Sequence, residues 1–438
     1  MSKPIRRLAA EETWREALPV RDAQTAWLDA ARAEAHARFA ELGLPTPRTE
    51  NWRWSDIHRY LNAPYAPLAE APLDNDVLQA LLQSHLLGVA DASVMVFVNG
   101  RFSQQHSRIM EEEGVEILAL SEAPVAIDWA DIAADADDAV DLLNMAHVTD
   151  GALIRVRAGV DASIPLLIVN VAAGAQGHSV ALRHFIRVEE GAHFTLFEAQ
   201  LGGGDMVASQ ITRAIVHDDA SLTRVQVNER DEAAILLAAL KAEVGAHGAL
   251  HDTALLTGGR YTRQNTQVAF TGDHAEATAN AAYLLRGRQH ADTRLKVLHT
   301  QPHCTSRETF RCVMDEHARG AFQGLIHVFP GAAKTDGEMS AHGLLLGEDA
   351  EFDSKPELEI YHDDVVCAHG SAVGALDEQQ LFYLRARGVP ERTARAMLVA
   401  AFVGEVFDAV DDERVREALT AFAERWLADG TKASGEAA

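Results

Sequence analysis

The sequence is poor in cysteine and in basic residues. Three cysteines in 438 residues exclude a disulfide framework and favour a reducing compartment with free thiols. Lysine and arginine total 39, against 65 aspartate and glutamate residues, so the formal net charge is -26. Nucleic acids and anionic membrane surfaces are poor partners for such a chain.

Long apolar runs are also missing. Stretches such as Met397–Gly404 are far shorter than the ~20 residues that a transmembrane helix needs. The first twenty residues contain no apolar segment typical of a secretory signal. We therefore expect a cytoplasmic protein with no membrane partner.

Common catalytic signatures are absent. The segment PGAAKT at residues 330–335 lacks the glycine and lysine spacing of a phosphate-binding loop. The glycines at 202–204 do not form a dinucleotide-binding pattern, and no G-x-S-x-G motif occurs. The sequence therefore favours a scaffold over an enzyme.

The chain divides into three regions. Residues 1–148 are predicted to be mostly helical, with a helix over Asp22–Leu42 and a strand over Val94–Val98 that ends in the Asn99-Gly100 turn. Residues 373–438 are predicted to be helical again. There Asp377 is an N-cap, Gly388 ends the first helix and Pro390 begins the next.

The middle region, residues 149–372, is rich in short β-prone runs. Turn-type residues recur there at steps of 13 to 15 residues, at Asp218, Asp231, Gly245, Gly258, Gly272, Gly287 and Pro302. An antiparallel sandwich or barrel can give this spacing, and so can a β-solenoid with stacked coils. We favour the solenoid, because it keeps more than two hundred residues in strands around one continuous core.

The pair Cys367 and His369 is the main candidate for chemistry. Residues two apart in a strand point to one side, so a thiol and an imidazole would share a face suited to a soft metal or a sulfur species. The simpler interpretation is a buried cysteine and a histidine bonded to the backbone. Two ligands do not complete a metal site, so others would come from elsewhere in the fold or from a second subunit.

A second cluster contains His299, His303, Cys304 and Cys312. Pro302 interrupts it, and the spacing matches no zinc motif. We therefore interpret these residues as structural.

Several segments resemble the SufB/SufD family of iron–sulfur cluster assembly scaffold proteins. They are RTENWRW at 48–54, VFVNGRF at 96–102, DEHARGAFQGLIHV at 315–328 and the long run from Ala332 to Gly388 that contains the Cys-x-His pair. The resemblance implies a right-handed parallel β-helix between N- and C-terminal helical domains, and a non-catalytic role. Cys304 and Cys312 are not positions where this family is expected to carry cysteine.

The resemblance also implies partners and site residues. A SufB-like subunit would pair near the C-terminal end of the core, where Cys367 and His369 lie and where the histidine is implicated in cluster formation. A SufC-like ABC-type ATPase would dock on the C-terminal helices, at Leu381, Phe382, Tyr383, Leu398 and Phe402. The isolated chain would hold no tight cofactor, only a transient iron–sulfur cluster in the complex, and it could form a homodimer.

Two other functions remain open on sequence grounds. One is a carbohydrate-active β-helix enzyme, and the other is a self-assembling structural solenoid.

Overall fold

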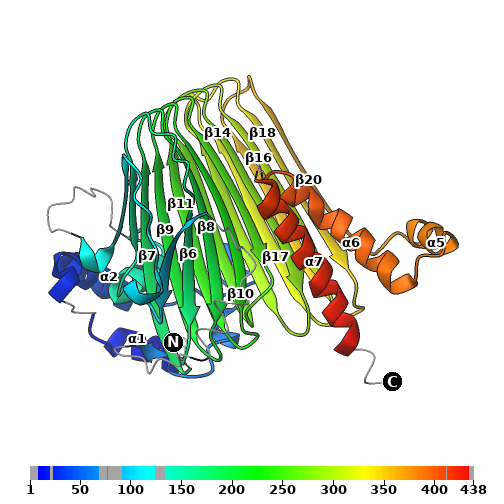
Figure 1. Ribbon diagram of the computed structural model, residues 1–438, viewed down its shortest axis with the longest axis horizontal. Helices are drawn as coiled ribbons and strands as arrows, with labels where there is room; N and C mark the ends of the chain where they lie inside the picture. The colour runs from blue at the N-terminus through cyan, green and yellow to red at the C-terminus, as the bar shows by residue number, and fades with distance from the viewer. Residues whose placement is uncertain are drawn as a thin grey trace, which may run out of the picture.

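Two long sheets dominate the computed structural model (Figure 1). It describes residues 8–19, 23–68, 76, 91–123, 134–174, 176–410 and 412–433. Sheet A contains β4 (Val115–Ala119), β5 (Ala152–Val156), β7 (His178–Val188), β9 (Val207–Val216), β11 (Ile235–Val244), β13 (Tyr261–Phe270), β15 (His290–His299), β17 (Arg319–Val328) and β19 (Glu351–Ile360), with β1 (Ala66–Pro67) beside β7. Sheet B contains β3 (Arg101–Phe102), β2 (Ser93–Val98), β6 (Leu166–Ala172), β8 (His193–Gly202), β10 (Ser221–Arg230), β12 (Ala249–Leu256), β14 (Glu276–Leu285), β16 (Thr305–Met314), β18 (Asp336–Leu345) and β20 (Val366–Gly374).

Successive strands alternate between the two sheets, so each coil contributes one strand to each. Neighbours within a sheet are parallel from β5 to β19 and from β2 to β20. Inward-facing positions are mainly apolar and form one continuous core, as expected when each coil buries only its inner face. The predicted β-helix is therefore confirmed, and each coil takes two of the predicted turn intervals.

The turns repeat in register as well. His247, His274 and His303 occupy the same corner of successive coils with φ of 54°, 56° and 61°, a left-handed conformation that is uncommon outside glycine. Their rings stack with centroids 5.0 and 4.5 Å apart. Asp219 and Lys334 have the same left-handed φ in the turns before and after these.

The N-terminal region covers sheet A. Its helices are α1 (Ala9–Glu16), α2 (Asp29–Leu42) and α4 (Ala139–His147), with short 3₁₀ turns η1 (Ala23–Leu28), η2 (Glu50–Trp52), η3 (Ile57–Arg59), η4 (Gln104–His106) and η5 (Leu120–Glu122). Trp14 Nε1 donates to the Tyr65 carbonyl, and Tyr60 stacks on Tyr261 of β13 at 4.5 Å. These contacts join the region to the solenoid through one apolar cluster.

Two sequence predictions for this region have different outcomes. The strand near Val94 is confirmed as β2, followed by a turn in which Asn99 and Gly100 have φ of 51° and 82°. The single helix over Asp22–Leu42 is wrong in its first part, because 3₁₀ turns precede an α-helix that begins only at Asp29. Thr25 is buried there and receives a hydrogen bond from Arg32, which fixes the non-helical backbone.

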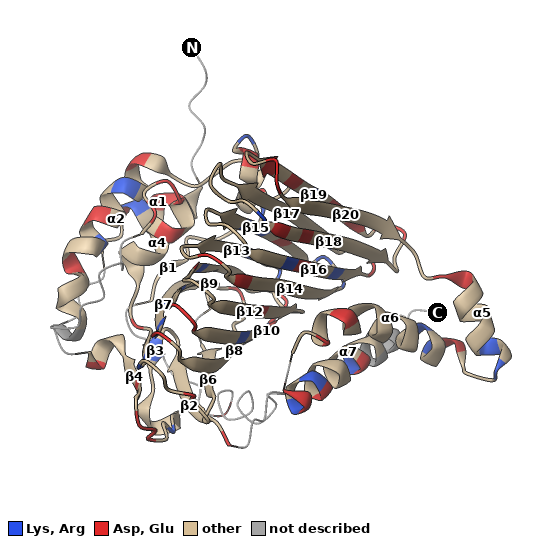
Figure 2. Cartoon of the chain, turned by 90° about the horizontal axis from the view of Figure 1, so that it is seen from above, with Lys and Arg blue, Asp and Glu red and all other residues tan. Residues whose placement is uncertain are grey.

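The C-terminal helices cover part of sheet B. They are α5 (Glu378–Ala386), α6 (Glu391–Phe407) and α7 (Glu413–Ala433). The predicted caps are confirmed, since the Asp377 side chain accepts from two N–H groups of α5 and Gly388 has φ 86°. Figure 2 shows α6 and α7 on the side of the solenoid away from α1, α2 and α4, while α5 projects beyond β20.

The strands differ slightly from the predicted domain limits. β5 begins at Ala152, inside the limit at 149, and β20 ends at Gly374, beyond the limit at 372. From the N-terminal region, β1, β2 and β4 pair with β7, β6 and β5. The boundaries at residues 148 and 372 stay predictions. In the described part of the chain, no helix combines the length and the apolar character needed to cross a membrane.

Candidate functional site

Cys367 and His369 lie on β20, the last strand of sheet B. Cys367 is opposite Gly337 of β18, and His369 is opposite Met339. Met339 is fully buried in the solenoid core, so this row of β20 continues the inward-facing positions of the coils below. The two side chains therefore share one face, as the sequence predicted.

The end of the solenoid leaves these two residues differently covered. Cys367 is half-buried and packs against the core, whereas His369 is exposed. Burial, together with Asp336 and Glu308, raises the pKa of the Cys367 thiol. The thiol is therefore protonated at neutral pH, and binding a metal would require it to release that proton.

A buried polar group lies two strands below His369 in the same row. Glu308 of β16 is opposite Met339, which is opposite His369. Burial raises the pKa of Glu308 to about 8, opposed by Ser306, so this carboxyl is mostly protonated at pH 7. Sequence reasoning missed Glu308, although Ser306, Glu308 and Phe310 alternate as inward positions of a strand.

His299 adds a second polar group to the interior. Its Nε2 lies 3.0 Å from Ser306 Oγ, and burial lowers its pKa to about 4, so the ring is neutral at pH 7. It lies in the core rather than at a surface where a metal could enter.

The other members of the second cluster do not converge. His303 is exposed at a turn, while Cys304 is buried with its Sγ 3.4 Å from the Gly272 carbonyl. Cys312 is buried in the core, and burial raises the pKa of its thiol strongly. Across the residues that the structure describes, no group of three or more histidine, cysteine, aspartate or glutamate side chains could hold a metal ion.

The C-terminal end of the solenoid is uncovered. Most residues of β19 and β20 are exposed or half-buried, whereas most strands in the middle of the solenoid are largely buried. Exposed apolar residues gather at this end, with Tyr361 61%, Val366 71% and Val373 50% exposed. A free strand edge beside exposed apolar side chains tends to pair with another chain, so we expect a partner to cover it.

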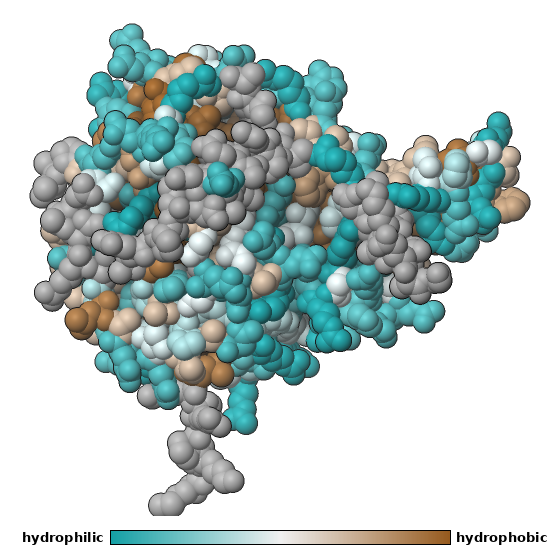
Figure 3. Space-filling model, turned by 60° about the horizontal axis from the view of Figure 1, so that its bottom comes forward, coloured by the Kyte–Doolittle hydropathy of each residue, from teal (hydrophilic) through white to brown (hydrophobic). Residues whose placement is uncertain are grey.

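The five residues predicted to dock an ATPase lie in different environments. Phe382 and Tyr383 are exposed on α5 by 72% and 57%. Leu398 is half-buried on α6 and lines a hollow between α5 and α6. Leu381 is buried, and Phe402 packs against the cluster between α6 and sheet B. Figure 3 shows hydrophobic patches on the part of the molecule that projects from the solenoid.

Comparisons with known proteins place both the core and the N-terminal region in one family. The family model for the SUF system FeS cluster assembly SufBD core domain matches residues 170–402, and that for the SufBD protein N-terminal region matches residues 15–168.

Named relatives agree with these matches. The chain is 30% identical over 405 residues to the iron-sulfur cluster assembly protein SufD of Escherichia coli K12, covering 89% of this chain and 91% of that protein. It is 23% identical over 449 residues to SufD of Bacillus subtilis 168, covering 96% and 98%. The chain therefore belongs to the SufBD family of SUF-system iron–sulfur cluster assembly proteins, which confirms the resemblance seen in its motifs.

Proposed function

We propose that this chain is a non-catalytic scaffold subunit of a SUF complex, paired with a SufB-like subunit and coupled to a SufC-like ATPase. The observation that supports this most directly is the uncovered C-terminal end of the solenoid, where Cys367 and His369 share a face with exposed apolar residues around them. An end of this kind can continue its sheets into a second subunit. In the absence of that subunit, a homodimer would use the same end.

The pairing surface would be β19 and β20. Both strands offer backbone groups on an open edge, and Tyr361, Val366 and Val373 would be buried on association. Aromatic and branched apolar residues at the centre of an interface contribute most of its binding energy. The paired subunit would thereby enclose the half-exposed thiol and imidazole.

Iron and sulfide are the cargo of the proposed site. A cluster iron is usually held by thiolates, and imidazole can replace some of them. Cys367 and His369 would supply two ligands from this chain, and the partner would supply the others. Because the partner would enclose the site, it would also keep water away from the growing cluster. This is an advantage of a site at the interface between two subunits.

The ATPase would bind α5 and the hollow beside it. That hollow has a volume of ≈ 520 Å³ and is lined by Asp377, Gln379, Gln380, Tyr383, Leu384 and Leu398. Phe382 and Tyr383 would be the contact residues, while Leu381 and Phe402 would support the helices from inside.

A mechanical connection leads from this docking surface to the solenoid. Val399, Val403 and Val406 of α6 are buried in the cluster against sheet B, and Arg311 of β16 forms an ion pair with Glu405 at 2.8 Å. Movement of α6 would therefore reach β16, which is two strands from β20. Two arrangements that nucleotide favours unequally are sufficient for such coupling.

The alternative functions have less support. A carbohydrate-active enzyme and a self-assembling solenoid both fit a β-helix. Neither accounts for the match to assembly proteins along the whole solenoid. Co-purification with an ATPase, rather than polysaccharide turnover or filament formation, would separate the three.

The test is anaerobic cluster reconstitution with iron and sulfide on the complex of this chain with its SufB-like and SufC-like partners. Replacing His369→Ala should remove most of the cluster absorbance while the complex stays assembled. His247→Ala is the matched control, because it removes an exposed imidazole at a turn several coils before the end of the solenoid. Unchanged assembly in the His369→Ala complex would remove this residue from the mechanism.

A further inference from the structure

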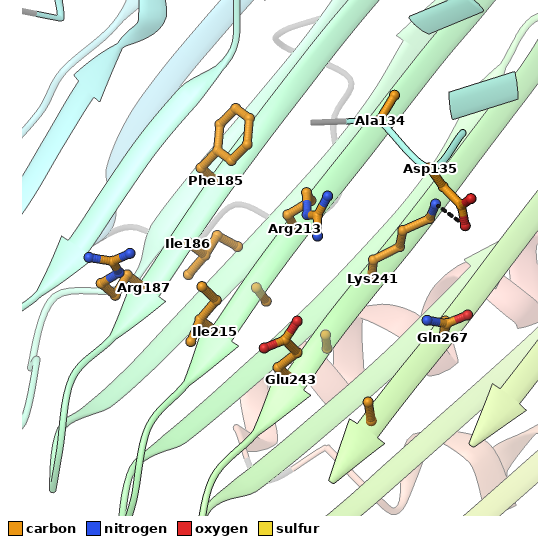
Figure 4. Close-up of a pocket in the computed structure, with 13 residues that line it drawn as sticks. Ala134, Asp135, Phe185, Ile186, Arg187, Arg213, Ile215, Lys241, Glu243 and Gln267 are labelled. Carbon is orange, nitrogen blue, oxygen red and sulfur yellow. Dashed lines mark ion pairs between the residues drawn. The ribbon is translucent and has the colours of Figure 1, made fainter. Parts of the chain in front are cut away.

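A groove runs along sheet A beside the N-terminal region. Its volume is ≈ 520 Å³. Strands β11, β13 and β15 form the floor, and segments 42–52 and 135–139 form the walls. Figure 4 shows the adjoining cavity of ≈ 350 Å³, which shares Asp135, Lys241 and Gln267 with the groove. The two hollows therefore lie next to each other on sheet A.

The acidic residues on the wall already have partners. Lys241 Nζ lies 3.6 Å from Asp135 Oδ2 and 3.8 Å from Asp138 Oδ2, and the dashed line in Figure 4 marks the first of these pairs. Asp137 pairs with Arg38 at 3.2 Å. The other oxygen of Asp138 caps α4 by accepting from two backbone N–H groups. Lys241 lies nearest to a third carboxylate, Asp141, at 2.6 Å, and Asp138 also attracts Arg294 of β15 without a direct ion pair.

Two basic side chains on the floor of the groove form no direct ion pair with any residue that the structure describes. Arg294 and Lys296 are two residues apart on β15, so both point outward into the groove. Neither has a hydrogen-bond or ion-pair partner among the described residues. Burial and the nearby Arg263 charge lower the pKa of the Arg294 guanidinium, and the more distant Asp138, Glu357 and Glu50 carboxylates offset this only in part. In a chain of net charge -26, two adjacent cations without a direct ion pair are unusual.

The polar groups around these cations can act as donors. Asn265, opposite Arg294 on β13, accepts from Arg263 with its Oδ1, which leaves its NH₂ group to donate. On the wall, the Thr46 and Thr49 oxygens accept from the N–H groups of Arg48 and Thr46. Their hydroxyl hydrogens are therefore free to donate. Guanidinium, ammonium, amide and hydroxyl donors converging on one space suit an oxyanion.

We propose that this feature, the basic groove (Arg294, Lys296, Asn265, Thr46 and Thr49), binds a small molecule that carries a doubly charged oxyanion, either a phosphoryl group or paired carboxylates. Arg294 would make a bidentate contact and Lys296 would supply the second charge. The groove has a volume of ≈ 520 Å³, which suits a small molecule, and the net charge of -26 opposes binding of a long polyanion. The ligand is therefore a small molecule rather than a nucleic acid or a membrane surface.

The test is calorimetric titration of the full chain with two probes, pyrophosphate and citrate, at low and at high salt. We expect saturable binding of at least one probe that weakens as salt rises. The double variant Arg294→Gln with Lys296→Gln should weaken binding by at least about tenfold, since each lost charge-assisted bond contributes strongly. The preferred probe then tells whether the natural ligand is a phosphoryl compound or a polycarboxylate.

Two further variants keep the result interpretable. Lys334→Gln removes a cation from a turn outside the groove, one that is paired with Asp364 at 2.8 Å, so this variant should bind the probes normally. Arg294→Lys keeps the charge and should retain part of the affinity. Equal binding by the wild type and the double variant, or no binding of either probe by the wild type, would overturn the proposal.

Discussion

One inward row of sheet B has very different properties along its length. In register across successive strands, it contains Leu196, Arg224, Asp252, Ala279, Glu308, Met339 and His369, and Glu198 lies in the next inward row, opposite Gln226. In the middle coils, Arg224 pairs with Glu198 at 2.9 Å and with Asp252 at 2.7 Å, and all three are buried. Glu308 stands between apolar neighbours, and His369 reaches solvent.

The comparison shows that the position of a polar side chain along the solenoid decides whether it is charged, neutral or exposed. Burial opposes ionisation of Glu198, but the Arg224 charge outweighs it and lowers the pKa of that carboxyl. Glu308 has no such partner in its row, so burial prevails and its pKa rises. His369 has no coil above it to bury it. The same strand geometry thus yields a charged, a protonated and an exposed polar group.

The largest effect should come from the middle of this row. Replacing Arg224→Met would leave two buried carboxylates without their counter-ion, which costs about 3–5 kcal/mol. Arg319→Met, which breaks a half-exposed pair with Glu351, should cost at most about 1 kcal/mol. Chemical denaturation measures both, and equal losses would contradict the difference between sealed and open coils.

A pH-dependent effect should come from Glu308, and per pH unit it is smaller than the loss expected at Arg224. The pKa of its carboxyl is raised from 4.5 to about 8 in the folded chain, so the unfolded chain ionises first as pH rises. Stability should therefore be complete below the unfolded pKa and should fall between about pH 4.5 and 8, by at most ~1.4 kcal/mol per pH unit.

The matching variant is Glu308→Gln, which cannot ionise. Its free energy of unfolding should decline less over this range, so that the variant gains on the wild type as pH rises. If the free energies of unfolding of the two proteins ran parallel with pH, Glu308 would ionise at the same pH in the folded and the unfolded chain. That result would contradict the raised pKa.

The last prediction concerns the rates at which the three cysteines react with a thiol reagent, a change that leaves the stability of the chain unaltered. Cys367 should react with a thiol reagent at least about a hundredfold faster than Cys312, because Cys312 must wait for the core to open. Burial raises the pKa of Cys304 to about 11, so it should also be slow. Mass spectrometry of the labelled chain gives the three rates, and binding of a partner at β19 and β20 should slow Cys367 alone.

Much of the fold could be predicted from local patterns. The turn interval identified the coils, because a stacked strand and its turn need a nearly constant number of residues. The cap at Asp377 and the glycine at 388 gave the ends of α5 correctly, since capping depends on neighbours in the chain. The helix over Asp22–Leu42 failed in its first part, where the hydrogen bond from the buried Arg32 to Thr25 overrides local propensity.

The candidate site was only partly predictable. Strand alternation gave the shared face of Cys367 and His369, and the interpretation of Cys304 and Cys312 as structural stays a prediction. Strand alternation could have shown that Glu308 faces inward, but only the register of the coils places it beneath His369. The basic groove was also invisible, because its floor and walls are more than a hundred residues apart in the chain.

The sequence by itself determined the repeat of strands and turns, the helix caps and the family, because each depends on residues close together in the chain or on motifs read directly. The tertiary structure decided which polar side chains are buried, which of these have a counter-ion, and which remain exposed at the C-terminal end of the solenoid. Those properties depend on the coils stacked above and below, and stacking joins residues that the chain itself keeps about thirty positions apart.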